Sequence, residues 1–330
     1  MICGESSLTR HNPTRSAPFG AGSVSVGLHA YRPSAAGRLA DLAAQARLAV
    51  EGGFDGFTLA EHHAGLNGYV PNPGQVAGWL LGEVAGGWAA ACPILLPLRS
   101  AALVAEEIAW LAARHPGRVG VGFAPGFAPA DFAIAGVAVE DRRHRFAVAL
   151  PVVVAALQGR AVGPLAADPA IAITTTLPVP AAAIVDGPIG ARRAAAAGAG
   201  AIIGAFTAPA TVRSLLEVYD AAGGRGPRLL IRRAWLGTLP DGALEQMLAA
   251  ARRLGPGGSS ERAADDVLVV DTDPGALAER LAAVLRESGA DALNLRFMAP
   301  EAGGAEVEDQ LARFGSGVLP RLRDLIGRLS

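Results

Sequence analysis

The sequence predicts an α/β fold, a closed (β/α)8 barrel forming a single domain, and three observations support this prediction. Short apolar runs alternate with segments of helical periodicity along nearly the whole chain, which is typical of parallel strands joined by right-handed crossovers. The number of expected strands is the number that closes such a barrel. Hydrophobic residues make up 51% of the 330 residues, enough to fill a large core.

The expected strands are short and apolar, and each ends where glycine, proline or polar residues begin a loop. The run 93–96 is continuously apolar, as expected for a strand covered on both faces. In chain order the expected strands are 23–28, 57–60, 93–96, 119–123, 182–185, 201–204, 228–236 and 292–297.

The expected helices have apolar residues at helical spacing and, in several cases, a capping residue at the start. Ser34 and Ser100 are expected to cap the first and third, because serine side chains accept hydrogen bonds from free backbone N–H groups. In chain order the expected helices are 34–51, 75–85, 100–114, 141–157 with a kink at Pro151, an Ala-rich helix from 188, one from 207 to 219, 241–253, 274–287, and 306–329 with a break near 315–317.

The chain shows no internal repeat and no linker that would divide it. Residues 1–22 are mixed and polar and are expected to form a loose extension before a barrel domain over 23–330. Residues 159–180 are irregular and Pro-rich, and are expected to be an insertion after the fourth helix. The glycine-rich stretch 254–260 is either a mobile lid or a plain loop, and the sequence does not decide between them.

Composition excludes several functional classes. A net charge of -1 argues against a dedicated nucleic-acid or anionic-membrane surface. The longest apolar stretch, 147–157, is too short to cross a bilayer, and the beginning of the chain lacks the apolar segment of a signal peptide. Cys3 and Cys92 are too few for a disulfide framework. A cytoplasmic location is therefore expected.

Glu61, His62 and His63 end the second expected strand, and a loop follows. Active sites of such barrels lie at the C-terminal ends of the strands. An imidazole holds or releases a proton near neutral pH, so we predict that His62 is catalytic, with Glu61 or Asp55 orienting it. Adjacent residues of an extended chain point to opposite sides, so His62 and His63 are not expected to share a metal ion.

Two glycine-rich turns belong to the same face. The turn 186–190 opens a helix, whose free N–H groups and dipole suit a phosphate, although Pro188 removes one donor and an ordinary strand-to-helix turn explains the pattern equally well. Gly122, Ala124 and Gly126 end the fourth strand. Arg296, at the end of the eighth, can bind an anion or pair with a carboxylate.

The chain resembles the bacterial luciferase-like flavin monooxygenases over residues 24–329. The stretches that carry the resemblance are 53–56 with 61–63, 72–73 with 76–81, 96–99 with 105–107, 117–122, 131–132 with Gly136, and 289–296.

The resemblance implies a luciferase-like TIM barrel that binds reduced FMN and reacts it with dioxygen on a small organic substrate. His62 matches the family's active-site histidine, which assists peroxyflavin chemistry by proton transfer, and Glu61 is placed with it as catalytic. It further implies a separate flavin reductase and a homodimer, which the Ala- and Trp-rich helices at 76–90 and 101–114 also favour. The residues expected to contact the cofactor are His63, Gly122, Ala124, Gly126, Asp186, Gly187, Pro188 and Ile189.

One departure from the family pattern concerns the phosphate. Pro125 stands where many members carry an arginine that pairs with it, and a charge-assisted hydrogen bond of this kind contributes about 1.5–3 kcal/mol. A deazaflavin-dependent hydride-transfer enzyme on the same barrel is therefore one alternative. A barrel that binds flavin without turnover is another.

Overall fold

A computed structural model describes residues 16–66, 68–254, 268–299 and 302–327. The sheet has nine parallel strands, and all except β8 close into a ring in the order β1-β2-β3-β4-β5-β6-β7-β9, with β9 returning to β1. The predicted TIM barrel is therefore confirmed. The ring strands are β1 (Val24–Gly27), β2 (Gly56–Leu59), β3 (Trp88–Leu95), β4 (Val119–Ala124), β5 (Ala181–Ile184), β6 (Gly200–Ile203), β7 (Arg228–Leu236) and β9 (Ala292–Arg296).

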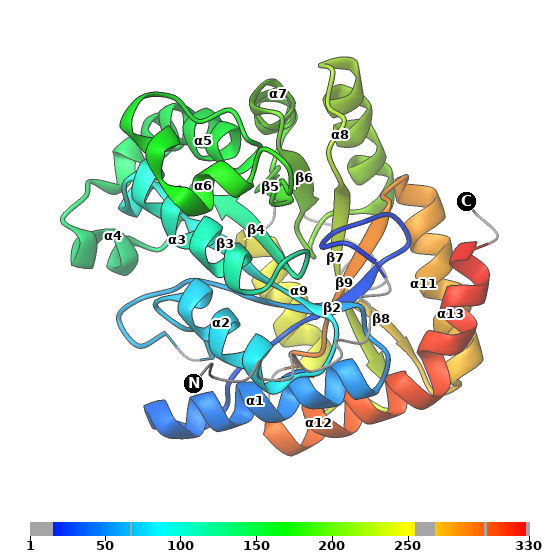
Figure 1. Cartoon of the computed structure of the whole chain (residues 1–330). Coiled ribbons are helices and arrows are strands. Elements are labelled where there is room, and N and C mark those ends of the chain that lie inside the picture. Colours follow the sequence, from blue (N-terminus) through cyan, green and yellow to red (C-terminus); the bar gives the residue numbers. More distant parts are fainter. Residues whose placement is uncertain (1–15, 67, 255–267, 300–301, 328–330) are drawn as a thin grey trace, which may run out of the picture.

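Helices surround the strands on the outside of the barrel (Figure 1). The first helix lies beside a helix from the end of the chain, so both ends of the sequence join in closing the ring of helices. The helices are α1 (Ala35–Glu51), α2 (Pro73–Glu83), α3 (Ala101–Arg114), α4 (Pro129–Ala135), α5 (Arg142–Leu157), α6 (Pro169–Ile173), α7 (Pro188–Ala197), α8 (Pro209–Ala221), α9 (Ala243–Leu254), α11 (Pro274–Ser288), α12 (Gly304–Arg313) and α13 (Leu319–Gly327).

Capping was predicted correctly at one of two serines. The Ser34 hydroxyl accepts a hydrogen bond from the Gly37 N–H at 3.0 Å. Ser100 holds the N-cap position of α3, but its side chain makes no capping hydrogen bond. The expected break in the last helical segment is a π-helical turn over Phe314–Val318.

Four elements differ from the prediction. β3 starts at Trp88, five residues before the expected start, because pairing with β2 and β4 overrides the weak strand preference of three consecutive alanines. The short helices α4 and α6 were not predicted. Neither was β8 (Leu268–Asp271), which pairs with the second half of β7 outside the ring.

The N-terminal end of the barrel is closed by the segment before β1. Phe19 is fully buried, with its ring edge against the Trp88 ring at a centroid distance of 5.4 Å. A Cβ at Gly120 would lie 2.8 Å from Pro18, so the neighbouring backbone also fits closely. The expectation of a loose extension over 1–22 is therefore wrong at Phe19. Residues 1–15, and the stretch 254–260 beyond Leu254, lie outside the described residues.

The barrel has an inner and an outer core. The outer core fills the space between strands and helices, with Leu42, Ile108 and Leu281 as typical members. The inner core fills the N-terminal half of the barrel with apolar side chains: Phe19, Trp88, Ala90, Cys92, Ala182, Ile202, Leu229, Ile231 and Ala292. The polar interior above it belongs to the C-terminal end, where the predicted site lies.

Candidate active site

His62 lies just after β2 at the C-terminal end of the barrel, and a carboxylate from another loop holds its ring. Its Nδ1 is 2.8 Å from Oδ2 of Asp131, in the first turn of α4. The other Asp131 oxygen accepts the His63 backbone N–H at 2.7 Å. An ionised carboxylate only accepts hydrogen bonds, so His62 Nδ1 carries a proton and donates it. The Nε2 atom is left as the position where the neutral ring accepts a proton.

Glu61 has a different partner from the one predicted. One of its oxygens contacts His63 Nε2 at 2.9 Å, and the other accepts the Leu95 N–H at 2.7 Å. Its side chain is fully buried. Asp55 lies at the opposite end of β2, where it accepts the Val24 N–H and pairs with Arg323. The hypothesis that Glu61 or Asp55 orients His62 is therefore wrong, because Asp131 makes that contact.

Aromatic rings surround the imidazole. The Tyr69 ring meets the His62 ring edge-on at a centroid distance of 4.7 Å, and Phe127 does so at 5.8 Å. The Tyr69 ring also contacts the ring of His29, the second residue after β1, at a centroid distance of 5.2 Å. A Cβ at Gly68 would lie 1.8 Å from the His29 ring, so glycine is required there. The loops after β1, β2 and β4 therefore share one aromatic cluster.

The strand ends beside this cluster carry positive charge. Arg296 is the last residue of β9, and Arg233 lies near the end of β7. Burial lowers the pKa of both guanidinium groups. Burial also lowers the pKa of His29 to about 4, and the charges of Arg296, Arg233 and Arg38 act in the same direction. His29 is therefore neutral at pH 7, unlike its two arginine neighbours.

The glycine near the end of β4, Gly122, and the glycine in the loop after it, Gly126, serve packing in this structure. Gly122 is buried, and a Cβ there would lie 2.4 Å from Cys92 Sγ and 2.8 Å from Ile202 Cδ1. Gly126 has a positive φ of 72° and faces the Phe132 ring. Ala124 is buried. The close approach that the glycines permit is made by the protein's own side chains.

The turn before α7 is open to solvent. Gly187 is the N-cap, no side chain caps the helix, and a Cβ at Gly187 would meet no atom within 4 Å. Asp186, Pro188 and Ile189 are exposed. Among the described residues, no hydrogen bond or ring contact joins this turn to His62, so the structure brings His62, His63, Glu61 and Asp131 together but not the turn.

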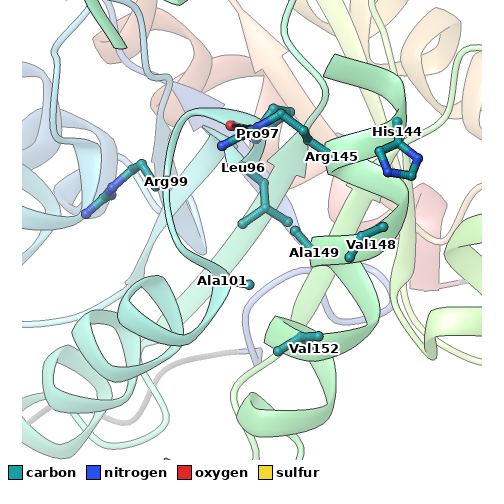
Figure 2. Close-up of a pocket in the computed structure, with 9 residues that line it drawn as sticks. All are labelled: Leu96, Pro97, Arg99, Ala101, His144, Arg145, Val148, Ala149 and Val152. Atoms are coloured by element: carbon teal, nitrogen blue, oxygen red, sulfur yellow. Dashed lines mark hydrogen bonds between the residues drawn. The ribbon is translucent and has the colours of Figure 1, made fainter. Parts of the chain in front are cut away.

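A groove of about 430 Å³ lies elsewhere, between the start of α3 and helix α5 (Figure 2). It is lined mainly by apolar side chains, with His144 and Arg145 from α5 and Arg99 near the start of α3. None of its lining residues belongs to the His62 cluster. It is a separate surface feature.

Among the described residues, no group of three or more His, Cys, Asp or Glu side chains is arranged to hold a metal ion. The same residues include no helix with the length and apolar character needed to span a membrane.

The structure is a TIM barrel with a histidine–aspartate pair at its C-terminal end. Sequence comparison shows the family to which this barrel belongs. The model of the luciferase-like monooxygenase family matches residues 21–292. The chain therefore belongs to this family of enzymes. No curated protein matches the chain.

Solved structures with the same fold include both flavin and deazaflavin proteins. A monooxygenase from Streptomyces bottropensis superimposes with a TM-score of 0.68 at 18% identity, covering 90% of this chain and 99% of that one. An F420-dependent secondary alcohol dehydrogenase gives 0.70 at 19%, covering 92% and 99%. The oxygenating constituent of 3,6-diketocamphane monooxygenase from Pseudomonas putida, solved with FMN, gives 0.68 at 17%, covering 91% and 99%. At these identities the likeness establishes the fold.

Sequence reasoning missed three residues of this cluster. Asp131 lies 69 positions from His62, and Tyr69 stands in a loop of turn-forming residues. Arg233 lies within the expected strand 228–236, which was not considered as part of the site. A charged residue near the C-terminal end of a barrel strand was the available signal for Arg233.

Proposed function

We propose that this protein is a flavin-dependent oxidoreductase, a monooxygenase that uses reduced FMN and dioxygen on a small organic substrate. The observation that carries the proposal is the contact between His62 and Asp131 at the C-terminal end of the barrel. A separate flavin reductase would supply the reduced cofactor, and the working enzyme would be a cytoplasmic homodimer.

The residues at this end offer polar groups that a cofactor could satisfy. His29 Nδ1 and Tyr31 Oη are buried without a hydrogen-bond partner among the described residues. Such atoms are costly to bury unless a ligand or water satisfies them. The uncapped start of α7 offers the N–H groups of Gly187 and Ile189 to a phosphate, whereas Pro188 has none. When bound there, reduced FMN would supply the electrons that activate dioxygen.

His62 would act as the proton carrier of the reaction. Asp131 holds the proton on Nδ1, so that Nε2 accepts a proton from a reacting group or returns one to it. Glu61 would position the strand ends, because it links the His63 ring to the backbone N–H of Leu95, the last residue of β3. Tyr69 and Phe127 border the imidazole and reduce its contact with water.

The test begins with binding. Titrations with FMN and with the deazaflavin F420, in oxidised and reduced forms, should give tighter binding for FMN. Oxygen uptake with reduced FMN, a flavin reductase and a panel of small organic substrates should then be substrate-dependent, and His62→Ala should lower it about 10²- to 10⁴-fold. His144→Ala, an exposed histidine of the separate groove, is the matched control. Failure to bind either cofactor would overturn the proposal.

A deazaflavin-dependent hydride transfer is the second candidate function. It is favoured by Pro125, which places no positive charge in the loop after β4 where FMN-binding relatives are expected to carry arginine. Tighter binding of F420 than of FMN, with oxidation of an alcohol in the absence of dioxygen, would select this function over the first.

A further inference from the structure

Two arginines lie side by side inside the barrel at its C-terminal end. Arg233 on β7 and Arg296 on β9 are direct partners in the parallel register, and paired residues of neighbouring strands project to the same face. That face is the barrel interior, because Asn294, two residues before Arg296, donates hydrogen bonds to Ser25 on β1 and Thr58 on β2.

The backbone is adapted to this arrangement. A Cβ at Gly27 would lie 2.1 Å from Arg296 Cζ, so the guanidinium rests directly on β1 and only glycine leaves it room. Arg232, the neighbour of Arg233 on β7, points the other way and donates hydrogen bonds to the Ala205 and Thr207 carbonyl oxygens. The interior pair is therefore distinct from the arginine that holds the loop after β6.

The interior pair has no anionic partner among the described residues. Arg296 reaches the Thr58 hydroxyl at 3.4 Å, and Arg233 reaches the Met298 carbonyl oxygen at 3.1 Å and stacks on Phe206. No carboxylate of the described chain lies within 4.0 Å of either guanidinium. Two buried like charges repel each other and lose hydration, so an anion bound between them would stabilise this arrangement.

The same space holds neutral donors and acceptors without partners. Tyr31 Oη and His29 Nδ1 are buried and make no hydrogen bond to a described residue. His29 contacts both Tyr31 and Tyr69, and Tyr69 contacts His62. A ligand held by the arginines therefore lies in the same aromatic cluster as the proposed proton carrier.

We infer that Arg233 and Arg296 bind a carboxylate group of the substrate, so that the enzyme acts on small organic acids. Arginine presents planar pairs of N–H donors that match the two oxygens of a carboxylate. The cofactor phosphate is the other anion to consider, but the uncapped start of α7 is open to it. This inference rests on the proposed function only in naming the ligand as a substrate.

The experiment measures binding without turnover, so its failure is distinguishable from failure of the proposed function. Calorimetric titrations of the wild-type protein with benzoate against benzamide, and butyrate against butyramide, should show at least about tenfold preference for the acids. Arg233→Gln and Arg296→Gln should each remove most of this preference, and Arg233→Lys should retain part of it. Arg225→Gln, an exposed arginine outside the barrel interior, should leave it unchanged.

A second pair of ligands separates substrate from cofactor. If the arginines bind the substrate, the ratio of FMN to riboflavin affinity stays within about twofold in both glutamine variants. If the glutamine variants lower this ratio and the wild-type protein shows no preference for acids, the arginine pair binds the cofactor phosphate and the inference is overturned. Equal binding of acids and amides to the wild-type protein would also overturn it, and that measurement does not depend on any variant folding.

Discussion

His62 and Asp131 are 69 residues apart in the sequence, yet Nδ1 of one lies 2.8 Å from Oδ2 of the other. The fold brings the loop after β4 over the end of β2 to make this contact. Asp131 also accepts the His63 N–H, so a single buried carboxylate fixes both the ring and the backbone beside it.

Asp131→Asn should change the tautomer of His62 while leaving the fold intact. The amide oxygen can still accept the His63 N–H, but the amide NH2 can donate to Nδ1, which favours the proton on Nε2. We expect turnover to fall about 10²-fold. Nitrogen-15 NMR of the histidine rings would report the tautomer directly. Asp309→Asn, at an exposed salt bridge, is the control, and an unchanged ring spectrum together with normal turnover would contradict the prediction.

His29 should make stability depend on pH between about 4 and 6.5. Its pKa is lowered in the folded state, so the unfolded chain binds more protons in this window and stability rises with pH across it. The full effect is on the order of 3 kcal/mol. Urea unfolding at several pH values should show a shallower pH dependence for His29→Gln than for the wild type. His144→Gln, on the exposed surface, should keep the wild-type slope, and the prediction is wrong if both variants do.

Gly122→Ala should strain the barrel interior. The new Cβ would lie 2.4 Å from Cys92 Sγ, and overpacking of this kind costs about 1–3 kcal/mol of stability. Cys92→Ala in the same chain removes the sulfur and should recover about 1 kcal/mol or more relative to additivity. Denaturant unfolding of the double-mutant cycle measures the coupling. Gly82→Ala, in open space on α2, should not destabilise, and simple additivity at 122 and 92 would refute the packing argument.

The expected homodimer has a candidate surface on α2 and α3. Trp79 is 49% exposed and Trp110 is 56% exposed, and large aromatic side chains at a surface are typical of interfaces. Trp79→Glu should therefore convert a dimer to a monomer in multi-angle light scattering. Val162→Glu, at an exposed residue of the insertion, should not. A wild-type protein that scatters as a monomer at all concentrations would remove the dimer from the proposal.

The sequence predicted the barrel well because local periodicity and strand ends carry that information. It placed β2, β4 and β9 closely, and it put His62 at the C-terminal end. It did not predict β8, whose pairing depends on β7 extending past the ring. The partner of His62 was predicted wrongly for a similar reason. The hydrogen bond to Asp131 depends on how two loops meet in space, whereas the prediction considered residues close in the sequence, such as Glu61.

The Phe19 side chain closes the N-terminal end of the barrel, and this limits where the protein can be shortened. A version begun at residue 21, where the family match starts, would remove the ring that covers Trp88. We expect water then to reach the inner core in the N-terminal half of the barrel, although every strand would still be present.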